Sequence, residues 1–278
     1  MLKSKIFRPL MLASAALAAC ALAAPAHAQG DLLVAPTRVM INNAGSAEVV
    51  LSNIGAEPAT YRIALELRRM TEDGDFVDVD EASANPAERA ALDMVRYAPR
   101  RITLAPGQPQ AVRISIRPPE GLADGEYRVH MSFRAVPTAT TPEDNAKQDS
   151  AGGVTIKLVP VYGITIPVFL RKGRLEATAS MANPHLVTNG QGAQFLEVTL
   201  NRSGQRSVFG EVLGRSPKGE VLFNSRGIAV YPEINKRLLQ VPLSAEQAAK
   251  LKGPIKLEYR ELPENGGALI TELSASFK

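Results

Sequence analysis

The chain has 278 residues, which is enough for one large domain or two domains of ordinary size. Hydrophobic residues make up 45% and charged residues 22%, which excludes a disordered chain, a coiled coil and a collagen-like rod. The net charge of +4 comes without a basic run, which argues against a nucleic-acid partner. A single Cys excludes an internal disulfide framework, and three scattered His (His27, His130 and His185) leave little material for a metal or catalytic cluster. We therefore expect no metal and no cofactor.

The first 28 residues have the three parts of a secretory signal peptide. The basic first part contains Lys3, Lys5 and Arg8. The apolar stretch 10–24 follows and is too short to cross a membrane comfortably, and 26–28 is a small-x-small cleavage site. We expect a mature chain that begins at Gln29, lies in the periplasm and has no membrane span. The tetrapeptide ending at Cys20 resembles a bacterial lipobox, so a lipoprotein is the minor alternative.

Short apolar or alternating runs then recur about every ten residues and are separated by turn residues. The runs in the first half are 32–41, 47–51, 60–67, 76–79, 111–116, 127–136 and 154–170. Those in the second half are 175–178, 195–200, 207–212, 221–223, 237–241, 255–259 and 269–277. Strands at this spacing are typical of antiparallel sandwiches. The polar segment 171–174 separates the two series, so we predict an all-β chain with two β-sandwich domains, 29–171 and 172–278.

Few segments depart from this strand pattern. Pro86–Leu92 follows the capping residue Asn85 and Ser244–Leu251 begins with a capping Ser, so both are predicted to be short helices. Residues 138–152 have no apolar period and indicate a loop. The acidic cluster 72–81 contains an Asp-Gly pair typical of a hairpin turn; calcium binding is the alternative, although the spacing lacks the EF-hand pattern.

No catalytic motif is present. The chain has no Gly-x-Ser-x-Gly, no phosphate-binding loop and no Cys/His pair after the signal peptide, so we expect that it is not an enzyme.

Several short motifs in the first domain together resemble one family, the periplasmic pilus-assembly chaperones of the chaperone–usher pathway (PapD-like). They are Pro36-Thr37-Arg38-Val39, Val50-Leu51-Ser52-Asn53, Tyr97-Ala98-Pro99-Arg100-Arg101, Leu104-Ala105-Pro106-Gly107, Val112-Arg113-Ile114, Gly125-Glu126-Tyr127 and Ala135-Val136-Pro137. In the second domain, Leu262-Pro263-Glu264-Asn265-Gly266-Gly267 resembles the family's acidic turn near the C-terminus. The resemblance implies a divergent member with two immunoglobulin-like domains set as a boomerang around a cleft.

The apolar strand expected at 154–170 supports this resemblance on physical grounds. Val154, Ile156 and Leu158 begin a row that continues to Leu170 on one face at period two. The run contains Pro160 and Pro167, and Pro is tolerated at a sheet edge more readily than at its centre. A protein that lends such an edge to an incomplete client uses strand addition as its binding mode. The alternative is an ordinary core strand with both edges paired.

The resemblance also implies roles for single residues. Arg38 matches the family's cleft arginine, which binds the client's C-terminal carboxylate; the alternative is a surface Arg at a strand end. The family's cleft lysine aligns with Pro167, so the usual pair of cations is in doubt.

Arg113, Glu126 and Glu264 match a structural ionic trio between the domains, and the alternative is three unrelated surface charges. A buried trio of this kind fixes geometry more than it adds stability.

The function implied by the resemblance is that of a periplasmic chaperone. Its partners would be pilin-like subunits, which it would stabilise with the apolar edge strand, and an outer-membrane usher, to which it would deliver them. The alternative is a secreted β-sandwich for adhesion or carbohydrate binding, although the absence of Trp removes the side chain best suited to stacking on sugars.

Overall fold

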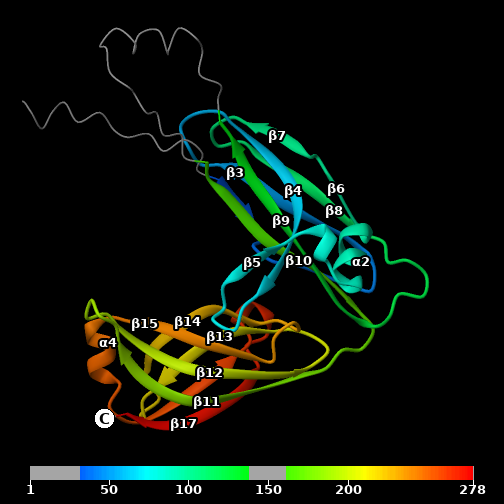
Figure 1. The fold of residues 1–278 in the computed structure, drawn as a ribbon. Coiled ribbons are helices and arrows are strands. Elements are labelled where there is room, and N and C mark those ends of the chain that lie inside the picture. Colours follow the sequence, from blue (N-terminus) through cyan, green and yellow to red (C-terminus); the bar gives the residue numbers. More distant parts are fainter. Residues whose placement is uncertain (1–31, 138–160, 278) are drawn as a thin grey trace, which may run out of the picture.

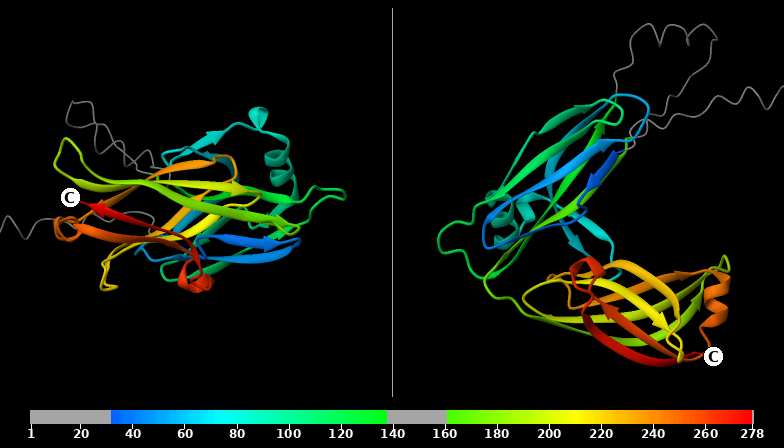
Figure 2. Two further views of the ribbon diagram at one scale, coloured as in Figure 1. Left: turned by 90° about the horizontal axis from the view of Figure 1, so that it is seen from below. Right: turned by 180° about the vertical axis from the view of Figure 1, so that it is seen from behind.

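Strands make up most of the computed structural model, which describes residues 32–137 and 161–277. They form two sandwiches that meet at an angle, as Figure 1 and the two rotated views in Figure 2 show. The predicted all-β class with two sandwich domains in a boomerang arrangement is therefore confirmed. The signal peptide, Cys20, the loop 138–152 and the first part of the expected strand 154–170 lie outside the described residues.

The first domain packs two sheets face to face. One sheet has the order β1-β3-β8-β6, with β1 Leu32–Ala35, β3 Gly45–Asn53, β8 Pro109–Ile116 and β6 Val95–Ala98. The other has the order β2-β10-β9-β4-β5, with β2 Val39–Asn42, β10 Gly163–Lys172, β9 Gly125–Val136, β4 Ala59–Met70 and β5 Phe76–Val79, and β7 Arg101–Leu104 also pairs with β4. β2 and β10 run parallel, and the other neighbouring strands of these two sheets are antiparallel.

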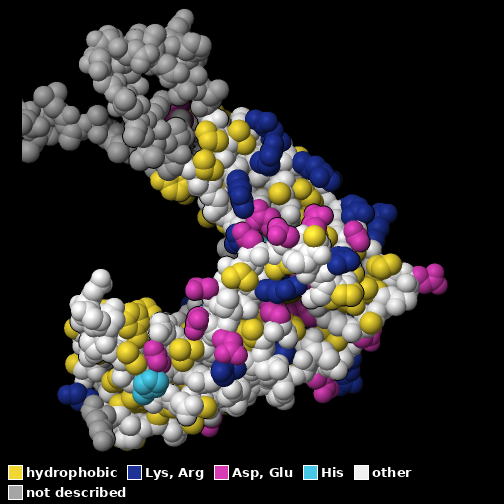
Figure 3. Space-filling model, viewed as in Figure 1, with side chains coloured by type: hydrophobic (Ala, Val, Ile, Leu, Met, Phe, Trp, Pro, Cys, Tyr) yellow, Lys and Arg dark blue, Asp and Glu magenta, His cyan; other side chains and the backbone are white. Residues whose placement is uncertain are grey.

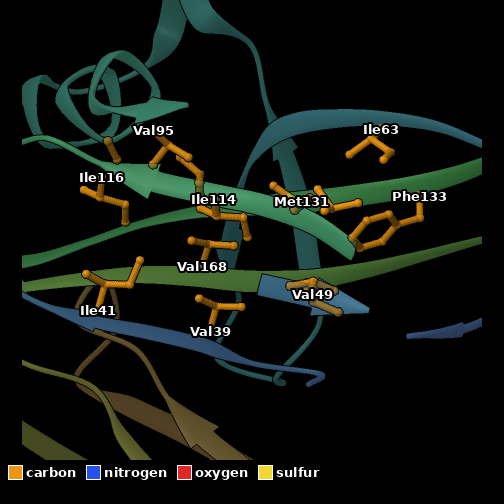
Figure 4. Packing of buried hydrophobic residues seen from close by; sticks show 14 of the residues in the cluster. Val39, Ile41, Val49, Ile63, Val95, Ile114, Ile116, Met131, Phe133 and Val168 are labelled. Carbon is orange, nitrogen blue, oxygen red and sulfur yellow. The ribbon is translucent and has the colours of Figure 1, made fainter. Parts of the chain in front are cut away.

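The space between these sheets is filled by apolar side chains at every second strand position, which is why the alternating runs of the sequence fold as strands (Figure 4). The residues labelled there are Val39, Ile41, Val49, Ile63, Val95, Ile114, Ile116, Met131, Phe133 and Val168. Burying one such side chain contributes about 1.5–3 kcal/mol. These core residues include Val39 and Ile41 of β2 and Val168 of β10, so one face of each of these two strands packs in the core.

Both predicted helices are confirmed, with ends that differ by one or two residues. Helix α2 (Pro86–Met94) is capped by Asn85, whose side chain accepts from the backbone N–H of Glu88 while the Glu88 carboxylate accepts from the backbone N–H of Asn85. Helix α4 (Ala245–Lys250) has the same reciprocal cap between Ser244 and Gln247. No helix of the described chain is long and apolar enough to span a bilayer.

The second domain is a smaller sandwich. Its sheets have the orders β11-β12-β15 and β14-β13-β16-β17. The strands are β11 Ala177–Thr188, β12 Gln194–Gly204, β13 Val208–Arg215, β14 Val221–Val230, β15 Lys236–Leu243, β16 Gly253–Arg260 and β17 Leu269–Phe277. Its core is separate from that of the first domain, and it includes Leu196, Val198, Val212, Leu257 and Tyr259.

The β4–β5 hairpin leaves the first domain and reaches the second (Figure 1). The predicted turn is confirmed, with Gly74 at φ +89° at its tip. The backbone carbonyl of Glu72 accepts a hydrogen bond from the backbone N–H of Leu238 on β15 at 2.7 Å, and the Glu72 carboxylate lies 3.0 Å from Lys236 Nζ. The acidic cluster is thus a docking element between domains, and the described residues contain no group of three or more His, Cys, Asp or Glu placed to hold a metal ion.

Candidate functional site

A deep indentation separates the two lobes of the molecule (Figure 3). Where the domains meet, a cleft of about 810 Å³ lies between the start of β2, the end of β10 and the second domain. The second domain lines it with the start of β11, residues 206–209 and the segment 261–270 that leads into β17. Three arginines line this cleft, and they are Arg38, Arg171 and Arg206.

Arg38 immediately precedes β2, and both domains hold its guanidinium group. The guanidinium carbon lies 4.0 Å from the ring centroid of Phe169 on β10 and 4.3 Å from that of Phe209 on β13. Its two terminal nitrogens donate to Tyr231 Oη and Ser207 Oγ, each at 3.3 Å. Burial lowers the pKa of Arg38, but a guanidinium group still keeps its charge at any physiological pH.

No carboxylate among the described residues lies within salt-bridge distance of Arg38. The group uses two of the five N–H bonds that a guanidinium carries, and it is partly exposed to the cleft. A partly desolvated cation with donors to spare and no carboxylate within salt-bridge distance can bind an external anion, although the charge of Glu126 acts on Arg38 from farther away.

Arg171 on β10 supplies a second cation beside Arg38. Its Nε lies 2.8 Å from Glu126 Oε2, and its Nη2 donates to the carbonyl and the hydroxyl of Ser207 at 3.3 Å. The Glu126 side chain is 1% exposed and accepts from both the N–H and the hydroxyl of Ser207. Ser207 Oγ therefore donates to Glu126 and accepts from both arginines, so one residue of the second domain joins the cleft side chains of the first.

The expected ionic trio of Arg113, Glu126 and Glu264 is wrong. Arg113 is 82% exposed and pairs with Glu48, the residue directly opposite it on β3. Glu264 pairs with Arg226 inside the second domain at 2.8 Å.

Only Glu126 of the trio lies at the domain junction, where its partners are Arg171 and Ser207. Arg113 and Glu264 each pair with a residue of their own domain, so neither contributes to the contact between the domains.

A second contact holds the junction on the hairpin side. Glu233 in the loop after β14 accepts from Arg128 Nη2 at 2.5 Å. The guanidinium carbon of Arg128 also lies 3.9 Å from the ring centroid of Tyr231. Tyr231 in turn packs against Phe169 and Phe76 with ring centroids 5.8 and 5.9 Å apart. The aromatic cluster around Arg38 thus continues into the base of the hairpin.

The backbone of β10 explains the position of Pro167. The carbonyl of Tyr162 accepts from the backbone N–H of Ala135 on β9, whereas the carbonyl of Arg171 accepts from Asn43 at the end of β2. Backbone groups of successive strand residues point to opposite sides, so the even-numbered residues face β9 and the odd-numbered ones face the β2 side. Pro167 is odd-numbered, and the N–H that it lacks belongs to the β2 side.

That side of β10 is only half covered. β2 pairs with β10 from Val168 to Arg171. From Gly163 to Pro167 no strand of the described chain pairs with this side, so Pro167 costs no ladder bond there. β10 is therefore an interior strand at its C-terminal half and an edge strand at its N-terminal half.

The apolar row of β10 passes from the core to the surface along the same strand. Ile166, Val168 and Leu170 are each 1% exposed, and Ile164 is half-buried. Tyr162, the next member of the row, is 51% exposed. Val154, Ile156 and Leu158, which we expect to contact a client, lie outside the described residues.

The sequence reasoning missed Arg171, Ser207 and Phe209. Arg171 carried a usable signal, because it shares the cleft face with Pro167 at period two. Ser207 and Phe209 carried none, since nothing in the second domain's sequence indicates which of its strand ends faces the first domain.

No family model and no curated protein matches the chain. Solved structures of fimbrial chaperones are similar to it. They include the SafB chaperone in complex with the SafA pilin from Salmonella enterica (14% identity, 90% of this chain and 98% of that chain, TM-score 0.46) and the E. coli chaperone DraB (14%, 90% and 97%, TM-score 0.45). The CupB2 chaperone of Pseudomonas aeruginosa is a third (14%, 88% and 100%, TM-score 0.44). At TM-scores below 0.5 these similarities carry no weight for the function, which is derived below from the cleft and from β10.

Proposed function

We propose that this chain is a periplasmic chaperone that binds pilin-like subunits by strand addition to β10 and delivers them to an outer-membrane usher. The observation that carries the proposal is the half-covered edge of β10 that ends at Arg38. An unpaired strand edge offers backbone donors and acceptors to another chain, and extended peptides bind to such edges.

The position of β2 determines where the end of an added strand would lie. β2 runs parallel to β10 and begins with Val39 opposite Val168. A client strand on the free edge from Gly163 to Pro167 lies in line with β2. If it also runs parallel to β10, its C-terminus meets the start of β2, where Arg38 lies.

The charge at this junction selects that direction. A guanidinium group attracts a terminal carboxylate, which it can bind with two parallel hydrogen bonds, and it repels a terminal ammonium. Arg171 adds positive charge beside it, although Glu126 neutralises part of that charge. The favoured ligand is therefore an extended, apolar segment with a free C-terminus, which suits the last strand of an incomplete subunit.

The sequence extends the proposed client surface beyond the described residues. Val154, Ile156 and Leu158 continue at period two the row that Ile164 and Ile166 occupy on β10. Replacing Ile156 and Leu158 by Asp places charges in an apolar contact, so it should abolish subunit binding without unfolding the chaperone.

Delivery to the periplasm is part of the same proposal. Cleavage after Ala28 leaves Gln29 as the first residue, and the intact mass of protein from the periplasmic fraction tests this. A diacylglycerol adduct on Cys20 would show that the lipoprotein alternative holds.

The proposal is tested by producing the chain in a periplasm together with a pilin-like subunit of the same bacterium. We expect the subunit to co-purify with the wild-type chain as a one-to-one complex and to be degraded when the chain is absent. A subunit that accumulates equally with and without the chain, and that never co-purifies with it, would overturn the proposal.

A further inference from the structure

We propose that Phe209, a residue of the second domain, is a positioning residue for Arg38 and thereby sets the preference for a free C-terminal carboxylate. The inference rests on the proposed function. It adds that the anchor on the first domain is completed by an aromatic ring of the second.

The contacts of Arg38 divide unequally between the domains. In its own domain the guanidinium carbon lies 4.0 Å from the centroid of the Phe169 ring. In the second domain it lies 4.3 Å from the centroid of the Phe209 ring and donates hydrogen bonds to the hydroxyls of Ser207 and Tyr231. An arginine side chain has several rotatable bonds, so without the second domain it would sample many orientations.

The Phe209 ring acts on binding in two ways. A cation held against an aromatic ring keeps a fixed plane, which leaves its remaining N–H bonds aimed in one direction. The ring also excludes water from one face of the guanidinium. A less hydrated cation loses less solvation when a carboxylate binds, so the pair becomes stronger.

Phe209 is free to serve this purpose because it is not part of the second domain's core. Its neighbours on β13, Val208 and Val212, belong to that core, whereas Phe209 lines the cleft and packs with Phe169 and Tyr231 at the domain junction. Phe209 is half-buried in the cleft wall, and its ring lies 4.3 Å from the guanidinium carbon of Arg38, which is the distance of a cation–π contact.

The test measures the affinity of a seven-residue probe peptide of alternating threonine and valine, N-acetylated, with either a free or an amidated C-terminus. The variants are Phe209→Leu, which keeps an apolar side chain but removes the ring, and Phe209→Tyr, which keeps the ring. Phe195→Leu makes the same change on β12 of the same domain, outside the cleft lining. The Nε–H resonance of Arg38 in NMR spectra reports the position of the ring directly.

We expect Phe209→Leu to reduce the preference for the free acid by about three- to tenfold, and to shift the Arg38 resonance, while affinity for the amidated peptide stays unchanged. Phe209→Tyr and Phe195→Leu should retain the wild-type preference. An unchanged preference in Phe209→Leu, or an equal loss for both peptides, would overturn the role of Phe209. A wild-type chain that binds both peptides equally would instead refute the carboxylate anchor of the proposed function and this inference with it.

Discussion

Glu233 of the second domain accepts a hydrogen bond from the backbone N–H of Met70 in the first, with an N–O distance of 2.8 Å. The same carboxylate binds Arg128, whose side chain is 10% exposed. One acidic side chain therefore closes the junction at the hairpin, as Ser207 does at the cleft. These two contacts and the docked hairpin join the two domains.

Replacing Glu233 by Ala should lower the free energy of unfolding by about 2–4 kcal/mol, because it removes the carboxylate partner of a nearly buried guanidinium and leaves a backbone N–H without its acceptor. Urea denaturation measures the change. The matched control is Glu264→Ala, which removes one partner of an exposed pair with Arg226 and should cost less than about 1 kcal/mol. Equal effects of the two variants would contradict the assignment of Glu233 to the junction.

Thr165→Pro tests the free edge of β10. Residue 165 is odd-numbered like Pro167, so its N–H points away from β9 and the change should leave the thermal unfolding temperature nearly unaltered. A client strand on this edge, however, can no longer accept a hydrogen bond from the backbone N–H of residue 165, so its affinity should fall about tenfold. Thr165→Ala, which keeps the N–H, is the control. If the Pro variant binds the probe peptide as well as the Ala variant does, strands are not added along this edge.

Arg38→Ala should remove the preference for a free carboxylate over an amide, a loss of about ten- to a hundredfold for the free acid. The guanidinium group also contacts both domains, so we expect a lower thermal unfolding temperature, in contrast to a freely exposed arginine. Arg113→Ala, at a residue that is 82% exposed, serves as the control and should change neither quantity. Equal binding of the two peptide forms by wild type and by Arg38→Ala would return Arg38 to a purely structural role.

His130 should make stability depend on pH. Its ring is buried on β9 beside Phe76, and neither nitrogen has a hydrogen-bond partner among the described residues. Burial, followed by the nearby charges of Arg128, Arg68 and Arg38, lowers the pKa of His130 from 6.5 to about 3. The unfolded chain therefore binds a proton between these pH values that the folded chain does not.

The contribution of His130 to the free energy of unfolding is therefore constant above pH 6.5. It falls as the pH drops toward 3, by up to roughly 1.4 kcal/mol per pH unit. His130→Leu should flatten this part of the profile, and denaturation at a series of pH values measures it. A slope that survives in His130→Leu would mean that other groups cause it.

Local signals in the sequence were enough for the positions of most strands, the turn at Gly74 and both helix starts. They were not enough for strand bounds, since the run 32–41 is two strands in different sheets and the run 175–178 begins a strand that continues to Thr188. Asn85 and Ser244 act within four residues of themselves, so their roles need no knowledge of the rest of the fold. For Pro167 the local signal is incomplete, because strand parity tells which backbone groups share an edge, whereas which edge is free depends on the positions of β2 and β9.

The ion pairs could not be predicted in this way. Arg113 binds Glu48 because the register of β3 against β8 sets the two opposite each other, and that register is not visible in either run alone. The partnership of Glu126 with Ser207 depends on how two separately folded domains are oriented. Side-chain pairing between domains is a property of that orientation, and a motif within one domain does not contain it.

The parallel pair of β2 and β10 has a consequence for how the protein comes to be folded. β10 is the last strand of its domain in the sequence, yet it lies between β2, near the start of the domain, and β9. Contacts between segments so far apart in the chain form late, because a long loop must close first. The edge that is proposed to capture clients therefore belongs to the strand that is synthesised last in its domain, after all the strands with which it packs.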